Sequence, residues 1–180
     1  IEMVQRLFKT PTLYLVFNAK NAKEAEKRMP STSSTRTFNS MGHRIWAQYT
    51  RKTLALNPKK SSDILREIIN ETPKAAQGEL WASFWSVVDG VGRAKAIGYV
   101  PEGKYPQARR LCTQSEFHRS LDEAPDDLTS DLIEAVLFRS IQTSYAGSID
   151  FNDQIYMPAL FGGTYPRFPI VTVDEYQDLN

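Results

Sequence analysis

The sequence has little of what disulfide-bonded, zinc-binding or membrane proteins need. Its 180 residues include a single cysteine, Cys112, and two histidines. One cysteine excludes an intrachain disulfide and a cysteine-rich zinc site, and it is compatible with a reducing compartment. No apolar run approaches the length of a membrane span, and the amino terminus lacks the layout of a signal peptide. These absences predict a cytoplasmic protein that does not interact with membranes.

Two glycine-rich nucleotide-binding signatures are also missing. No Gly-x-x-x-x-Gly-Lys-Ser/Thr segment occurs, because Gly103-Lys104 is followed by tyrosine and lacks the second glycine. Gly90-Val91-Gly92 lies within a helical pattern and does not follow a strand, which argues against a dinucleotide fingerprint. We therefore expect the chain alone to show no ATP hydrolysis.

Acidic residues are scarce in the first third of the chain. Residues 1–60 hold 12 Lys and Arg against 3 Asp and Glu, whereas residues 61–180 hold 10 against 18. This asymmetry indicates a basic face for a polyanion on the first third, although a solvated, charge-rich surface would give the same counts.

Strand and helix patterns alternate at the start of the chain. Leu13 to Phe17 is a continuous apolar run typical of a buried parallel strand, and Asn18 to Arg28 reads as a helix. Arg36-Thr37-Phe38 is expected to be a short strand, and a helix begins at Asn39. A helical pattern also covers Ile1 to Phe8, which is typical of a piece cut from a longer protein. The alternation predicts an α/β fold with a parallel sheet.

The middle of the chain has helical patterns only. Ser61 to Asn70 and Gly78 to Tyr99 are expected to be helices, Thr113 is expected to cap a short helix, and a long apolar stripe follows Pro125. No strand signal interrupts residues 61–145. The chain is thus predicted to comprise a sheet domain, residues 1–54 and 148–180, and an inserted all-helical subdomain, residues 55–147.

The end of the chain combines a strand with carboxylates. Val171 to Val173 is predicted to be a central, buried strand that delivers Asp174 and Glu175 to its carboxyl end, where open α/β sheets bind ligands. This is a Walker B pattern, although a strand followed by a solvated acidic turn would look alike. In the first interpretation Asp174, with Glu175, holds Mg²⁺, Glu175 activates the attacking water, and Gln177 senses the γ-phosphate.

Four segments carry a resemblance to a known family. Asp174-Glu175-Tyr176-Gln177-Asp178 resembles motif II of superfamily-one DNA helicases of the UvrD, Rep and PcrA type. Three further segments are similar to elements of the same family and stand in its order: Leu13 to Ala25, Thr37 to Met41, and Asp150 to Asp153. In Asp150 to Asp153, Asp150 is expected to cap a short helix. Asn39 departs from the family, which usually has histidine there, and so does Ala19.

The resemblance implies a partial RecA-like P-loop NTPase domain. ATP and Mg²⁺ would be its cofactors, and its partners would be single-stranded DNA, duplex junctions and a second RecA-like domain. The Walker A loop would precede Ile1, and motifs III to VI would follow Asn180. The implied activity is ATP-dependent movement on single-stranded DNA with unwinding of the duplex.

The residues also indicate a DNA surface. Phe17 and Phe38 each stand at the end of a predicted strand beside polar residues, and exposed aromatic side chains beside basic groups bind single strands by stacking. A phenylalanine at a strand end is more often part of the core, but the order of the motifs favours a DNA surface for one of the two. The predicted DNA-binding residues are Phe17, Asn18, Lys20, Thr37, Phe38, Asn39 and Ser40.

Two other functions fit the sequence. One is a non-catalytic nucleic-acid-binding module derived from a helicase, because the chain keeps the basic first third and lacks the phosphate-binding loop. The other is the helicase part of a helicase-nuclease.

Overall fold

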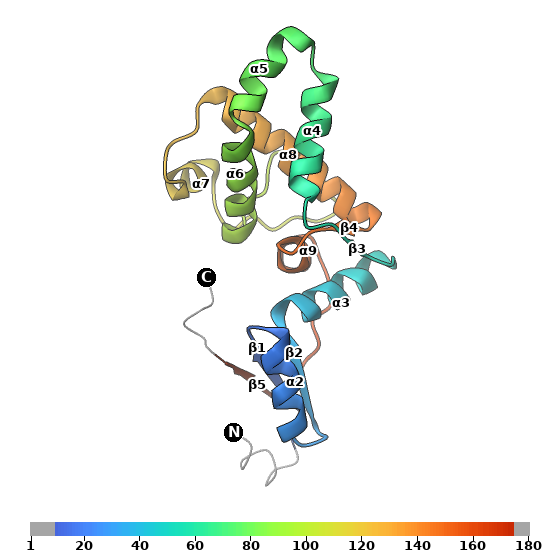
Figure 1. Ribbon diagram of the computed structural model, residues 1–180. Helices are drawn as coiled ribbons and strands as arrows, with labels where there is room; N and C mark the ends of the chain where they lie inside the picture. The colour runs from blue at the N-terminus through green and yellow to red at the C-terminus, as the bar shows by residue number, and fades with distance from the viewer. Residues whose placement is uncertain (1–9, 175–180) are drawn as a thin grey trace.

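The computed structural model describes residues 10–174, so the expected helix over Ile1 to Phe8 lies outside the described residues. The molecule is elongated, with a small sheet at one end and a helical body at the other (Figure 1). Helices α3 (Phe38–Thr50) and α9 (Asp153–Leu160) lie between the two ends. The α/β fold class is confirmed, since helices alternate with two small parallel sheets. Among the described residues, no helix combines the length and apolarity needed to cross a bilayer.

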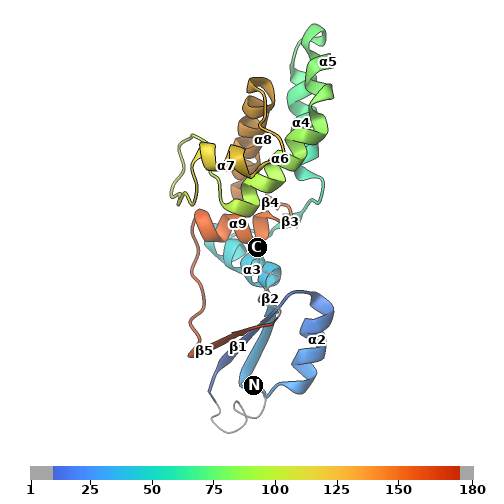
Figure 2. The same ribbon diagram turned by 90° about the vertical axis from the view of Figure 1, so that its left-hand side faces the viewer.

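The larger sheet has three parallel strands, and it is drawn from the side in Figure 2. They are β1 (Thr12–Val16), β2 (Ser33–Thr37) and β5 (Ile170–Val173), in the order β2-β1-β5. Strand β1 is the central strand of this sheet, and four of its five residues are buried. The expectation that residues 171–173 form the central strand is wrong for the described part of the chain. Strand β5 lies at the edge, and Val171 is 51% exposed.

Helix capping explains why the helices start directly after the strands. Helix α2 (Ala19–Arg28) is capped by Asn18, whose Oδ1 accepts the backbone N–H of Asn21 at 2.8 Å. Helix α3 begins with a capping box, in which Thr37 Oγ1 accepts the N–H of Ser40 and Ser40 Oγ accepts the N–H of Thr37. The predicted strand over 36–38 therefore ends at Thr37, because Phe38 is already the first helical residue.

Five helices form the helical body: α4 (Lys60–Glu71), α5 (Lys74–Ala82), α6 (Phe84–Ile97), α7 (Gln114–Ser120) and α8 (Asp127–Ala146). The helix predicted over 78–99 is instead two helices, because Ser83 leaves the helical conformation with ψ near 1°. The cap predicted at Thr113 is confirmed, since its Oγ1 accepts the N–H of Glu116 and the Glu116 carboxylate accepts the N–H of Thr113.

A two-stranded sheet closes the base of the helical body. Strand β3 (Ala55–Leu56) pairs in parallel with β4 (Ser148–Ile149), which brings together chain segments more than ninety residues apart. These strands were not predicted from the sequence, because two residues are too few to show a period. They hold the entry and the exit of the helical segment side by side.

The main hydrophobic core lies in the helical body and extends beyond residues 55–147. Trp46 from α3 and Phe161 after α9 are fully buried in it, and the indole N–H of Trp46 donates to the Ser144 carbonyl at 3.0 Å. Helices α3 and α9 pack closely at Gly42, where an added Cβ would lie 1.8 Å from the Gln154 carbonyl oxygen. This contact joins the sheet to the helical body.

Candidate nucleotide and nucleic-acid site

The carboxyl ends of the three parallel strands lie together along one side of the larger sheet, called here the sheet edge. Val16 pairs with Thr37, and Leu15 pairs with Val173, so the residues that follow β1, β2 and β5 emerge together. The backbone N–H of Asp174 donates to the Leu15 carbonyl at 2.8 Å and continues the ladder past the strand. Asp174 therefore lies beside the end of β1, where Phe17 leaves the sheet.

The two phenylalanines predicted to contact DNA differ in exposure. Phe17 is 59% exposed, which is incompatible with a role in the core of the described chain. Phe38 is half-buried at the first position of α3. Lys20 is exposed in the first turn of α2. An exposed aromatic ring and a nearby ammonium group at a sheet edge are suited to stacking a base and attracting its phosphate.

The polar side chains predicted to contact DNA are bonded within the molecule. Asn18, Thr37 and Ser40 cap helices α2 and α3. The amide of Asn39 donates to the Phe151 carbonyl at 2.9 Å. Helices α2 and α3 start directly after strands β1 and β2, and the amino-terminal end of a helix is a favourable environment for an anion.

Of the predicted catalytic and metal residues, only Asp174 is described. It is half-buried at the sheet edge. Glu175 and Gln177 lie outside the described residues. Mg²⁺ in nucleotide sites is held by one or two carboxylates and the substrate phosphates, so Asp174 fits the role of one such ligand. Within residues 10–174 no group of three or more His, Cys, Asp or Glu side chains is arranged to hold a metal.

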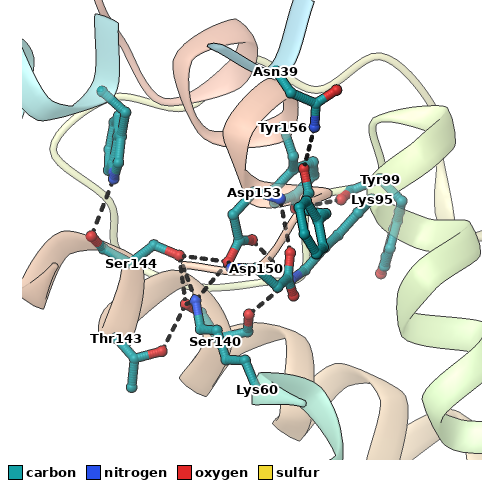
Figure 3. A network of polar contacts seen from close by, with 12 residues as sticks. Asn39, Lys60, Lys95, Tyr99, Ser140, Thr143, Ser144, Asp150, Asp153 and Tyr156 are labelled. Carbon is teal, nitrogen blue, oxygen red and sulfur yellow. Dashed lines mark hydrogen bonds and ion pairs between the residues drawn. The ribbon is translucent and has the colours of Figure 1, made fainter. Parts of the chain in front are cut away.

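A second polar cluster was not predicted from the sequence. Lys60, Lys95, Asp150 and Asp153, called here the buried quartet, meet where α4, α6 and α8 approach the turn before α9 (Figure 3). Lys60 Nζ lies 2.7 Å from Asp153 Oδ2, and Lys95 Nζ lies 2.6 Å from Asp150 Oδ2. Lys95 Nζ also lies 2.7 Å from Asp153 Oδ1, as an ion pair without a well-aligned hydrogen bond. The two positive and two negative charges balance.

The hydroxyl groups and turn around the buried quartet complete its hydrogen bonding. Ser144 Oγ and the Ser140 carbonyl accept from Lys60, and Ser140 Oγ accepts from Lys95. Asp150 and Asp153 also form a reciprocal cap, since each carboxylate accepts the backbone N–H of the other residue. The cap predicted at Asp150 is wrong in position, because Asn152 is the N-cap of α9 and forms no side-chain capping bond, while Asp150 accepts the N–H of Asp153, the first residue of that helix. The sequence contained one indication that Lys60 and Lys95 are buried, since each stands beside the apolar stripe of its helix, α4 or α6.

Burial and pairing shift the pKa values of two residues of the buried quartet, Lys60 and Asp153. Burial lowers the pKa of Lys60 to about 8, although the carboxylate of Asp153 opposes this shift. Burial alone would raise the pKa of Asp153, but Lys95 and Lys60 together hold it below its ordinary value. All four residues are at most 9% exposed. The quartet is therefore a buried ion-pair network that links α4 and α6 to the turn before α9.

The sheet edge and the buried quartet are connected through one turn. Phe151 lies between the two aspartates of the cap, and its carbonyl accepts the hydrogen bond from Asn39 in the first turn of α3.

No protein-family model and no curated protein sequence matches the chain. The resemblance to UvrD-like helicases is thus an expectation from the sequence segments alone.

Proposed function

We propose that the chain is part of the first RecA-like motor domain of a UvrD-like, ATP-dependent DNA helicase. The observation that carries the proposal is the meeting of Asp174 and Phe17 at the carboxyl edge of a parallel sheet. In such folds this edge binds ligands. The order of the four sequence segments that resemble the family supports the same assignment.

Each group at the edge has a distinct task in this proposal. Mg²⁺, when bound with ATP, neutralises charge on the β- and γ-phosphates. Asp174 holds that ion, and Glu175 accepts the proton of the attacking water. Phe17 stacks on a base of single-stranded DNA, and Lys20 attracts the adjacent phosphate. The proposal also requires a phosphate-binding loop and a second motor domain, which these 180 residues do not supply.

A non-catalytic nucleic-acid-binding module is the second candidate. It is favoured by the lack of a Gly-x-x-x-x-Gly-Lys-Ser/Thr segment in the chain. It uses Phe17 and Lys20 in the same way and assigns no chemistry to Asp174.

Both candidates depend on Phe17, and a substitution tests this. Phe17→Ala in the 180-residue chain is expected to weaken binding of a fluorescent oligothymidylate about 10-fold, because one stacked base contributes about 1–3 kcal/mol. Fluorescence anisotropy measures the affinity. Trp85→Ala is the matched control, since Trp85 is 69% exposed on α6 in the helical body. Equal affinities of the wild type and Phe17→Ala would refute a DNA surface at this edge.

A further inference from the structure

A cavity lies against the larger sheet, and its lining includes Ser40 from the first turn of α3 but neither Phe17 nor Asp174. It has a volume of about 450 Å³, which is within the usual range for small-molecule sites. Its lining comes from β1, β2, helix α3 and the segment 164–168 that leads toward β5. The register pairs Leu13 with Ser34, so side chains of both strands face the cavity together.

The charged lining of this cavity is entirely cationic. Arg36 of β2 and Arg44 of α3 line it, and no carboxylate does. Both arginines are exposed, and neither forms an ion pair or hydrogen bond with any described residue. Two larger cavities of the helical body differ sharply, because each is lined by several acidic residues. Anions are thus attracted to the sheet cavity and repelled from the other two.

The rest of the lining is largely apolar. Leu13 and Ile45 are buried, and Phe168 is half-buried beside them. A wholly apolar occupant would cover this surface but would leave two guanidinium groups desolvated without partners, which is costly. A small inorganic anion would satisfy the arginines and leave the apolar surface uncovered. The fitting occupant carries both an anion and an apolar body.

We infer that this cavity binds a nucleoside phosphate, with the phosphate between Arg36 and Arg44 and the base or sugar against Leu13, Ile45 and Phe168. Guanidinium groups bind phosphate oxygens in pairs, which makes arginine well suited to this anion. The nucleoside phosphate can be a free mononucleotide or one unit of a nucleic-acid strand. The site uses neither Phe17 nor Asp174, so it stands independently of the proposed function.

Calorimetric titration of the 180-residue chain with thymidine 5′-monophosphate tests the inference. Binding is expected to be at least 10-fold tighter than that of thymidine or of inorganic phosphate, since each of these has only one of the two recognised parts. Arg36→Met and Arg44→Met are each expected to weaken binding of the monophosphate about 10-fold. Arg93→Met is the matched control, because Arg93 is an exposed arginine that lines an acidic cavity.

Tetrathymidylate distinguishes the two sources of the ligand. A strand ligand is indicated if the tetramer binds more tightly than the monophosphate and loses affinity in both arginine variants. A free mononucleotide is indicated if the tetramer gains nothing. Trp85→Ala, which removes an exposed aromatic side chain of the helical body, leaves monophosphate binding unchanged in either case. Failure of the monophosphate to bind at millimolar concentration, or unchanged binding in both arginine variants, would overturn the inference.

Discussion

Single residues matter most in the buried quartet. A buried ion pair adds little to stability compared with apolar residues, but removal of one partner leaves an uncompensated charge in the core. Asp153 is fully buried and faces both lysines. It also receives the backbone N–H of Asp150, so its two oxygens join three chain segments. The free energy of unfolding is therefore more sensitive to Asp153 than to any exposed acid.

Asp153→Asn is expected to lower the free energy of unfolding by about 3–5 kcal/mol, because Lys60 and Lys95 lose the carboxylate between them. Chemical denaturation at neutral pH measures the loss. Asp131→Asn, an exposed position on α8, is the control and should change stability by less than about 0.5 kcal/mol. Similar losses in the two variants would contradict the role of the quartet.

Because the pKa of Asp153 is lowered, its contribution to the free energy of unfolding depends on pH in the acid range. Because its pKa is lower in the folded than in the unfolded chain, the unfolded chain binds more protons as the pH falls below the ordinary aspartate range. The stabilisation from Asp153 is thus present above that range and is lost as the pH falls toward its folded pKa. In Asp153→Asn this part of the acid loss should disappear.

Packing between elements is closest where α3 meets α9. Gly42 on α3 leaves no room for a side chain, since a Cβ there would overlap the backbone of Gln154. Gly78 on α5 has open space instead, with no atom within 4 Å of an added Cβ. Substitution by alanine is therefore expected to have opposite effects on stability at Gly42 and at Gly78.

Gly42→Ala is expected to destabilise the chain by more than about 2 kcal/mol, because α3 and α9 must separate to admit the methyl group. Gly78→Ala is expected to stabilise it by about 0.5–1 kcal/mol, because alanine favours the helix and meets nothing. Thermal unfolding followed by circular dichroism compares the two variants. A neutral Gly42→Ala would show that α3 and α9 are not packed as described.

Local signals predicted the elements better than the contacts between them. Asn18, Thr37 and Thr113 act on backbone groups three residues away, so helix starts can be derived from short stretches of sequence. The pairing of β3 with β4 and the meeting of Lys60 with Asp153 join residues more than ninety positions apart. Such contacts depend on how whole helices pack, which a single sequence does not encode locally.

The candidate site shows the same difference between local features, which the sequence predicted, and contacts between distant elements, which it did not. The strand pattern placed Asp174 at a strand end, as the structure has it. The same pattern left Phe17 compatible with the core, and its exposure is known only from the structure, in which β1 ends at Val16. The bonding of Asn39 to Phe151 does not, because it depends on the contact of α3 with the turn before α9. The central position expected of β5 was also wrong, since strand order depends on pairing that no local pattern specifies.

Across the whole molecule, charge separates the sheet end from the helical body. Residues 1–60, which supply β1, β2, α2 and α3, carry 12 basic and 3 acidic residues, and the rest of the chain is acidic. In the proposed function, this distribution would direct a nucleic-acid strand toward the sheet and away from the helices. The exposed Phe17 and the cavity of Arg36 and Arg44 both lie at this basic end.

The motor proposal makes its strictest demand on Glu175, in the intact helicase that the proposal assumes. Glu175→Gln is expected to lower DNA-stimulated ATP hydrolysis at least about 100-fold, because an amide cannot accept the proton of the attacking water. Nucleotide binding should persist, since Asp174 and the phosphate contacts remain. Glu79→Gln, an exposed position on α5, is the control and should leave turnover unchanged. Unchanged turnover in Glu175→Gln would exclude the motor assignment and leave the nucleic-acid-binding module, which needs Phe17 but no catalytic carboxylate.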